Sequence, residues 1–232
     1  MLDILKTLFT KDNDVLAEAQ AEFMEMLERT QAMFKDAKRG VWEQALTADE
    51  RKELYRSDRR VNKLERSVRR RVLVAMNTMG TGTDLNNCVL LLHVVKDAER
   101  IGDYCKNLSE LRDYDERDLG ADDVSATLRS IADEIDEIFA ATLPVMSPHG
   151  EIDAAVELLQ TARELCKRCD RQLLRIAKCD KDPSAVTVLV LLTRFYKRIA
   201  AHLSNVLSAA VMPLHKLDYF DERELEGLTD NS

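Results

Sequence analysis

Residues 97–110 read DAERIGDYCKNLSE, and this stretch decides the fold class. Glu99 and Asp103 are four residues apart within a long helical pattern, so both carboxylates lie on one face of a helix. At about 100° per residue, Asn107 and Glu110 return to the same side. The apolar residues around them fall on the opposite side: Leu91, Val94, Ala98, Ile101, Cys105 and Leu108. The pattern predicts a helix with one face for a core and one face rich in oxygen ligands.

The composition extends this prediction to the whole chain. With 232 residues, the protein is long enough for one large domain or two small ones. Hydrophobic residues make up 45% and charged residues 33%, which is typical of a folded, soluble protein. Because only 7 Gly and 4 Pro are present, turns are few and the elements are long. The sequence therefore predicts an all-α fold.

Charge and targeting features narrow the function classes. The formal net charge of -8 argues against a general nucleic-acid-binding protein, which is normally basic. No apolar stretch reaches the roughly 20 residues that span a bilayer. Residues 1–6 lack the pattern of a signal peptide, and five cysteines without such a signal are typical of a reducing compartment. We therefore expect a cytoplasmic protein.

Hydrophobic periodicity predicts three long helices in the first half of the chain. The first covers about residues 12–39 and is expected to end at Gly40. The second begins at a capping box, in which the Thr47 hydroxyl and the Glu50 carboxylate satisfy free backbone N–H groups, and runs to about residue 79. The third begins at residue 83 or 84 and runs to about residue 112. A short amphipathic helix, residues 1–9, precedes them.

The second half shows the same plan of three helices. The fourth helix covers about residues 121–143 and is expected to end at Pro144. The fifth starts around Pro148 and runs to about Lys178. The sixth starts at Asp182, an N-cap residue, which Pro183 follows at the first helical position.

An internal repeat supports this division. A shift of about 98 residues aligns the third helix with the sixth, pairing Arg100 with Arg198 and Asn107 with Asn205. We therefore expect two three-helix units, residues 1–119 with the short N-terminal helix and residues 120–232, that pack through their apolar faces.

Two motifs of the first unit resemble the signature of the PhoU family, the helical regulators of bacterial phosphate uptake. The order E-R-I-G-D-x-x-x-N occurs at residues 99–107, and the pattern D-x-x-V-N-x-L-E at residues 58–65. The resemblance implies two three-helix units, each bearing an E/D-x-x-x-D pattern in the family. In this chain the motif is clear only in the first unit.

The acidic face allows two interpretations. In one, it is a solvated helix face on which Lys96, Arg100 and Lys106 form exposed ion pairs worth a few tenths of a kcal/mol each. In the other, it binds a divalent or iron-type metal ion, because carboxylate and amide oxygens are the ligands that hard cations prefer. The resemblance favours the second interpretation, since PhoU members are known to bind metal clusters on this face.

A metal site of this kind would be asymmetric. Glu99 and Asp103 would be its primary ligands, whereas the second unit has Lys197 and Ala201 at the matching positions. Oxygen ligation favours iron, manganese, magnesium or calcium over zinc. Arg69 is expected to pair with the carboxylate four residues before it, which would weaken the site. The donors expected to complete the ligand set are Asp58, Asn62, Glu65 and Asn107.

The second predicted helix also carries a basic stripe, with Lys and Arg at spacings of three and four opposite its apolar face. This stripe is either a solvated face or a contact surface for an acidic partner or for anionic lipid headgroups. Its members are Lys52, Arg56, Arg59, Lys63, Arg66 and Arg70.

No residue constellation is typical of catalysis, so we expect no enzymatic activity. Cys166 and Cys169 form a lone C-x-x-C within a helical pattern, without the further ligands that zinc needs, and core or half-exposed thiols are expected. The four histidines are isolated, and no nucleophile has a base at a recognisable spacing. A single carboxylate cluster without a paired base disfavours a metal-dependent hydrolase.

The resemblance implies a binding function. The protein is expected to modulate phosphate transport or phosphate-responsive signalling by binding a phosphate transporter or a phosphate-sensing kinase. It is expected to bind no nucleic acid and to reach a membrane only through such a partner. PhoU relatives are often dimers, so a homodimer is expected. The alternative is an unrelated helical scaffold or adaptor with no metal or phosphate role.

Overall fold

The computed structural model is a bundle of six long helices. It describes residues 14–78, 83–114, 119–120, 122–147, 150–212 and 214. The helices are α2 (Asp14–Trp42), α3 (Ala48–Thr78), α4 (Thr83–Ser109), α5 (Asp123–Val145), α6 (Ile152–Ile176) and α7 (Pro183–Val211), with a short 3-10 helix η1 (Leu111–Asp113) after α4. The described ranges contain no strand, which confirms the all-α prediction. The predicted helix at residues 1–9 lies outside them.

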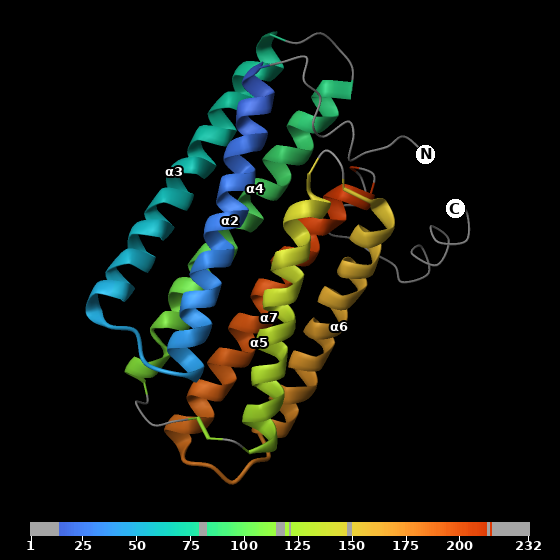
Figure 1. Ribbon diagram of the computed structural model, residues 1–232. Helices are drawn as coiled ribbons and strands as arrows, with labels where there is room; N and C mark the ends of the chain where they lie inside the picture. The colour runs from blue at the N-terminus through green and yellow to red at the C-terminus, as the bar shows by residue number, and fades with distance from the viewer. Residues whose placement is uncertain are drawn as a thin grey trace.

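The six helices run side by side along one long axis (Figure 1). Helices α2, α3 and α4 pack on one another, as do α5, α6 and α7, and the two groups meet where α4 contacts α7 and α2 contacts α5. Helix α3 lies at the outer edge of the bundle, packed against α2 and α4 (Figure 1). One face of α3 is therefore directed away from the rest of the molecule.

Two predicted helix starts are confirmed. At the start of α3, the Thr47 backbone N–H donates to Glu50 Oε2 at 2.8 Å, and the Glu50 N–H donates to Thr47 Oγ1 at 3.3 Å. At the start of α7, the Asp182 carboxylate accepts from the Ser184 N–H at 2.9 Å, with Pro183 as the first helical residue. Both starts satisfy N–H groups that a first turn leaves free.

Three predicted helix ends were wrong. Gly40 lies inside α2, which continues to Trp42; a Cβ at Gly40 would come within 2.8 Å of Leu46 Cγ, so the glycine permits close packing of the following loop. Pro144 lies within the last turn of α5, which ends one residue later at Val145, so the proline removes one i→i−4 hydrogen bond just before the helix stops. The third predicted helix breaks at Ser109, before the 3-10 turn of η1.

The start of the fifth predicted helix was also wrong. Helix α6 begins at Ile152, after Glu151 in an extended conformation, rather than near Pro148. Its end at Ile176 is close to the predicted end at Lys178. The residue before α6 makes no side-chain cap, so no sequence signal marked this boundary.

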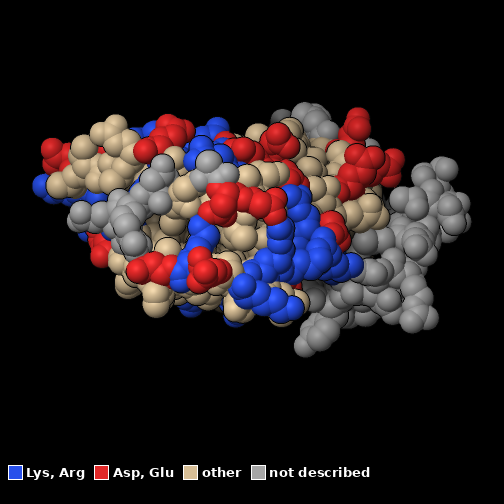
Figure 2. Space-filling view, turned by 90° about the horizontal axis from the view of Figure 1, so that it is seen from below, with Lys and Arg blue, Asp and Glu red and all other residues tan. Residues whose placement is uncertain are grey.

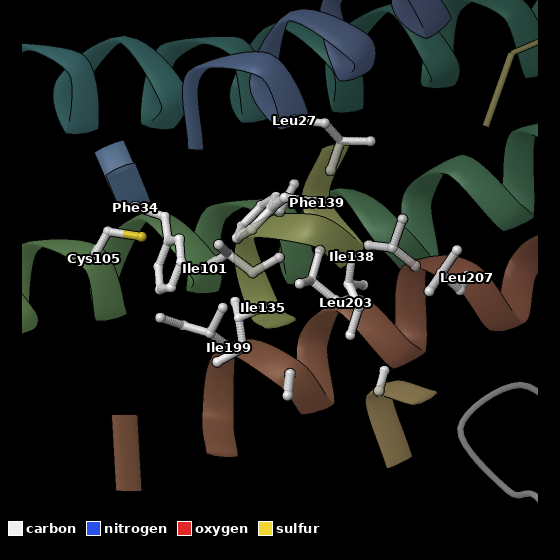
Figure 3. Close-up of a cluster of buried hydrophobic side chains, with 14 of the residues drawn as sticks. Leu27, Phe34, Ile101, Cys105, Ile135, Ile138, Phe139, Ile199, Leu203 and Leu207 are labelled. Atoms are coloured by element: carbon white, nitrogen blue, oxygen red, sulfur yellow. The ribbon is translucent and has the colours of Figure 1, made fainter. Parts of the chain in front are cut away.

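The hydrophobic core is shared by helices from both halves of the chain. Leu27 and Phe34 of α2 and Ile101 of α4 converge with side chains from α5 and α7 (Figure 3). The Phe34 ring lies 5.5 Å from the Phe139 ring and 6.2 Å from the Tyr196 ring, measured between centroids. Each of these fully buried side chains contributes about 1.5–3 kcal/mol through removal of apolar surface from water. The core therefore binds the two groups of helices together.

A buried hydrogen bond reinforces the junction of the two groups. Trp42 Nε1 at the end of α2 donates to Tyr196 Oη of α7 at 2.7 Å. The guanidinium of Arg129, from α5, lies 4.9 Å from the centre of the Trp42 ring. The division into units of residues 1–119 and 120–232 stays a prediction. Among the described residues, no helix has the length and apolar character needed to cross a bilayer.

Candidate cation site and basic stripe on α3 and α4

The acidic residues predicted to share a site meet along the contact of α3 and α4. Lys106 of α4 links them, because its Nζ lies 3.3 Å from Asp58 Oδ2 of α3 and 3.2 Å from Asp103 Oδ1 of α4. Asp58 is buried, and Asp103 and Lys106 are half-buried. The predicted arrangement of two facing helices is therefore present, with an ammonium group between two of its carboxylates.

Glu99 shows how closely the carboxylates are grouped. Burial raises the pKa of Glu99, and the negative charges of Asp103, Glu65 and Asp58 raise it further, while Arg100 acts in the opposite direction. Mutual repulsion of this kind requires carboxylates that lie near one another. The four acidic residues of the predicted ligand set thus form one electrostatic cluster.

Cations of the protein itself already neutralise much of this cluster. Arg100 Nη1 lies 3.1 Å from Asp103 Oδ2, and Arg69 Nη2 lies 2.7 Å from Glu65 Oε1, which confirms the expected pairing of Arg69. Burial lowers the pKa of Lys106, but the charges of Asp58 and Asp103 outweigh that effect and raise it overall. Lys106 therefore stays protonated at neutral pH as a built-in counter-ion.

The two amides of the predicted ligand set differ. Asn62 Oδ1 is buried and, within the described part of the chain, accepts no hydrogen bond, as expected for an oxygen left for a cation. Asn107 is half-buried one turn beyond Asp103, and no described residue hydrogen-bonds its side chain. Glu110 instead accepts a hydrogen bond from the Tyr55 hydroxyl, which raises the pKa of Tyr55 to about 12.

The donor chemistry suits a hard cation, but the geometry is not that of a preformed metal centre. Among the described residues, no three His, Cys, Asp or Glu side chains converge closely enough to hold a metal ion. The point between Asp58 and Asp103 is taken by Lys106 Nζ. A metal ion at this position would have to displace the ammonium group.

Among the described residues of the second unit, the matching face carries no comparable cluster. Lys197 Nζ lies 2.6 Å from both carboxylate oxygens of Asp170, and Ala201 provides no donor. The neighbouring thiols are not activated, because burial raises the pKa of Cys166 to about 11 and that of Cys169 to about 12. Both cysteines are free, and one is half-exposed and the other buried, as the sequence predicts.

Sequence reasoning missed a buried polar contact between the two halves. Asp97 of α4 is only 1% exposed, and its Oδ1 lies 2.7 Å from His202 Nδ1 and 3.0 Å from Asn205 Nδ2, both of α7. Its Oδ2 accepts from Lys96 Nζ at 3.0 Å, and the Tyr104 ring stacks on His202 with 5.7 Å between centroids. The sequence contained one signal for this contact: Asp97 is a charged residue within the apolar stripe of its helix, three residues after Val94.

All six residues of the basic stripe are exposed on α3. Arg56 Nη1 pairs with Glu53 Oε2 at 2.9 Å. Within the described part of the chain, no hydrogen bond or ion pair joins the other five to an acidic group: Lys52, Arg59, Lys63, Arg66 and Arg70. The stripe therefore stays largely unneutralised.

The lower end of the bundle also carries basic side chains. Figure 2 shows a patch of Lys and Arg on this face, bordered by acidic side chains. Arg175 pairs with Asp123 and Lys181 pairs with Asp122, where α5 begins and α6 ends. Two of the basic side chains near this end are therefore paired with acidic groups.

Part of the chain matches a known protein family. Residues 23–111 match the family model described as PhoU domain. No curated protein sequence gives a significant match to the chain. The matched residues contain most of α2 and all of α3 and α4, and therefore the whole acidic cluster.

Two solved structures share the fold of nearly the whole chain. The structure of PhoU from Pseudomonas aeruginosa superposes with a TM-score of 0.72 at 17% identity, covering 84% of this chain and 95% of that chain. The phosphate transport system regulatory protein PhoU from Streptococcus pneumoniae superposes with a TM-score of 0.67 at 13% identity, covering 83% and 91%. Residues 23–111 thus match the PhoU domain, and nearly the whole chain has the fold of the solved PhoU structures.

Proposed function

We propose that this protein is a regulator of phosphate transport or phosphate-responsive signalling that acts by binding a transporter or sensor-kinase subunit. The match of residues 23–111 to the PhoU domain carries the proposal. The likeness to a regulatory protein of a phosphate transport system supports it at the level of fold. The unneutralised basic stripe on α3 supports action by contact with a partner rather than by chemistry. On this proposal the protein works in the cytoplasm and reaches the membrane through its partner.

The proposal is tested by recovery of the partner from the native host. Tagged protein is isolated with solubilised membranes from cells grown with ample phosphate and from cells starved of phosphate. A phosphate-transporter or sensor-kinase subunit is expected to co-purify, with an amount that differs between the two conditions. Absence of both kinds of subunit under both conditions contradicts the proposal. Mass determination by light scattering in the same preparation tests the proposed homodimer.

We propose further that any metal ion binds asymmetrically, at the acidic cluster of the first unit. Glu99 and Asp103 would be its main ligands, and the buried oxygen of Asn62 would be the neutral donor. The geometry supports only weak binding by the natural protein, because the ion competes with the ammonium of Lys106. Elemental analysis of the purified protein and of a Glu99→Ala, Asp103→Ala double variant tests the location, since equal metal content in both would exclude it.

Removal of the competing ammonium is expected to strengthen metal binding. Lys106→Met keeps an unbranched side chain that ends at the Cε position, and leaves the carboxylates of Asp58 and Asp103 without their shared counter-ion. We expect the affinity for Mn²⁺, measured by titration calorimetry, to rise about tenfold, since one charge at about 4 Å is worth about 1–4 kcal/mol and about 1.4 kcal/mol corresponds to tenfold in affinity. The matched control is Lys197→Met in the second unit, which should produce no gain. A gain that persists after Glu99→Ala and Asp103→Ala would contradict the assignment.

A further inference from the structure

Helix α3 differs in charge from the rest of the molecule. It contains ten Lys and Arg residues against five Asp and Glu residues, in a chain whose net charge is -8. Its core face is apolar, with Val61, Leu64 and Val68 buried. The excess positive charge therefore lies on the sides and outer face of this helix.

The basic stripe runs straight along that outer face. Its spacing of three and four residues keeps the side chains within about 40° of one line, directly opposite the buried valines. From Lys52 to Arg70 the line is about 27 Å long at 1.5 Å per residue. Helix α3 is the edge helix of the bundle (Figure 1), and all six side chains of the stripe are exposed.

An exposed apolar pair continues the stripe by one turn. Leu73 is 55% exposed and Val74 is 46% exposed, and they fall on either side of the line that passes through Arg70. On α4, beside this end of α3, Leu85 and Val89 are 39% and 40% exposed. Exposed apolar residues that adjoin an unneutralised charged surface are typical of protein contact sites.

We propose that the basic stripe, together with Leu73 and Val74, binds an acidic helix of the partner protein. The inference rests on the proposed function, because it specifies the surface through which that partner is held. Carboxylates spaced three and four residues apart on a partner helix would match the stripe side chain by side chain, and an apolar residue at one end would pack on the pair. Arg, which forms four of the six members, suits bidentate contact with carboxylates.

The surroundings of the stripe favour a helix over a flat membrane surface. On the α2 side, Glu25 lies 3.1 Å from Arg60. On the α4 side, Glu65 pairs with Arg69 and Asp103 pairs with Arg100. An anionic bilayer would face these acidic flanks as well as the stripe. A helix, about 10 Å wide, contacts the stripe between them.

The probe for this surface is a synthetic helical peptide. It has about 20 residues, enough to span the stripe, with Glu at alternating spacings of three and four on one face and two Leu at one end. Binding to the full-length protein is measured by fluorescence anisotropy at two salt concentrations. We expect saturable binding that weakens as salt rises, and the double variant Arg59→Glu, Arg66→Glu should bind about tenfold more weakly.

Matched variants separate the stripe from general electrostatics. Lys178→Glu with Arg198→Glu changes the net charge equally at exposed positions on or next to α6 and α7, and should alter binding less than about twofold. Leu73→Ser with Val74→Ser should weaken binding on the order of fivefold, whereas Leu174→Ser, at a position that is 67% exposed, should not. Equal losses in the control variants would overturn the proposal.

Binding to lipid vesicles tests the alternative that the stripe contacts an anionic membrane. Binding to vesicles of phosphatidylglycerol and phosphatidylcholine in equal parts should be the same for the natural protein and for the Arg59→Glu, Arg66→Glu variant. Vesicle binding that those residues control, without peptide binding, would overturn the proposal in favour of lipid. If the Arg59→Glu, Arg66→Glu variant still recovers the transporter or kinase subunit from cells, this surface is wrong while the proposed function stands.

Discussion

Replacement of Asp97 by Ala is expected to lower the free energy of unfolding by about 2–4 kcal/mol. The Asp97 carboxylate lies at the contact of α4 with α7 and accepts hydrogen bonds from His202, Asn205 and Lys96. Its removal leaves the donors on α7 without an acceptor in a largely buried place. Urea denaturation followed by circular dichroism measures the change. The control is Asp180→Ala at an exposed position, which should stay within about 0.5 kcal/mol of the natural protein.

The same residue predicts how stability depends on pH. Burial alone would raise the pKa of Asp97, but the hydrogen bonds from His202, Asn205 and Lys96 outweigh it and lower the pKa below the ordinary value. Its contribution is therefore fully present above about pH 4 and is lost as the pH falls through the lowered pKa of the folded state. The natural protein should lose stability more steeply below pH 4 than Asp97→Ala does. Parallel curves for the two proteins, or a difference below 0.5 kcal/mol at neutral pH, would show that this contact does not stabilise the fold.

The fold could be predicted largely from local patterns. Apolar residues at spacings of three and four marked all six long helices, and side-chain caps at Thr47 and Asp182 marked two of their starts. The wrong end at Gly40 has a physical cause. A glycine signals the end of a helix only where packing does not require it, and at Gly40 the close approach of Leu46 requires a residue without a side chain. Tertiary packing, rather than the local sequence signal, therefore determines where this helix ends.

The sequence predicted the contacts of the candidate site only where they join two helices that follow one another in the chain. The facing of Asp58 and Glu65 towards Glu99 and Asp103 follows from two neighbouring helices in sequence, and the structure brings them together. The role of Lys106 as their counter-ion required the relative register of α3 and α4, which periodicity does not give. The partners of Asp97 on α7, His202 and Asn205, are more than 100 residues away in sequence, so no local pattern could name them.

The shared core predicts that the two halves unfold together. Phe34→Ala should destabilise the protein by about 3–5 kcal/mol, the usual cost of removing a buried aromatic side chain and leaving a cavity. Phe34 is fully buried on α2, between the rings of Phe139 on α5 and Tyr196 on α7. The cavity therefore opens on helices of both halves, and both should lose stability in one transition.

Trp42 is a suitable reporter for this prediction. It is the single tryptophan, it belongs to the first half, and its indole N–H is bonded to Tyr196 of the second. Tryptophan fluorescence reports the junction, while circular dichroism reports all helices, so the two urea curves should coincide and shift together in Phe34→Ala. Tyr114→Ala, at a position that is 60% exposed, is the control and should leave both curves in place. Fluorescence that changes well before helix content would mean instead that residues 1–119 and 120–232 separate first and fold independently, because the junction would then open while the helices persist.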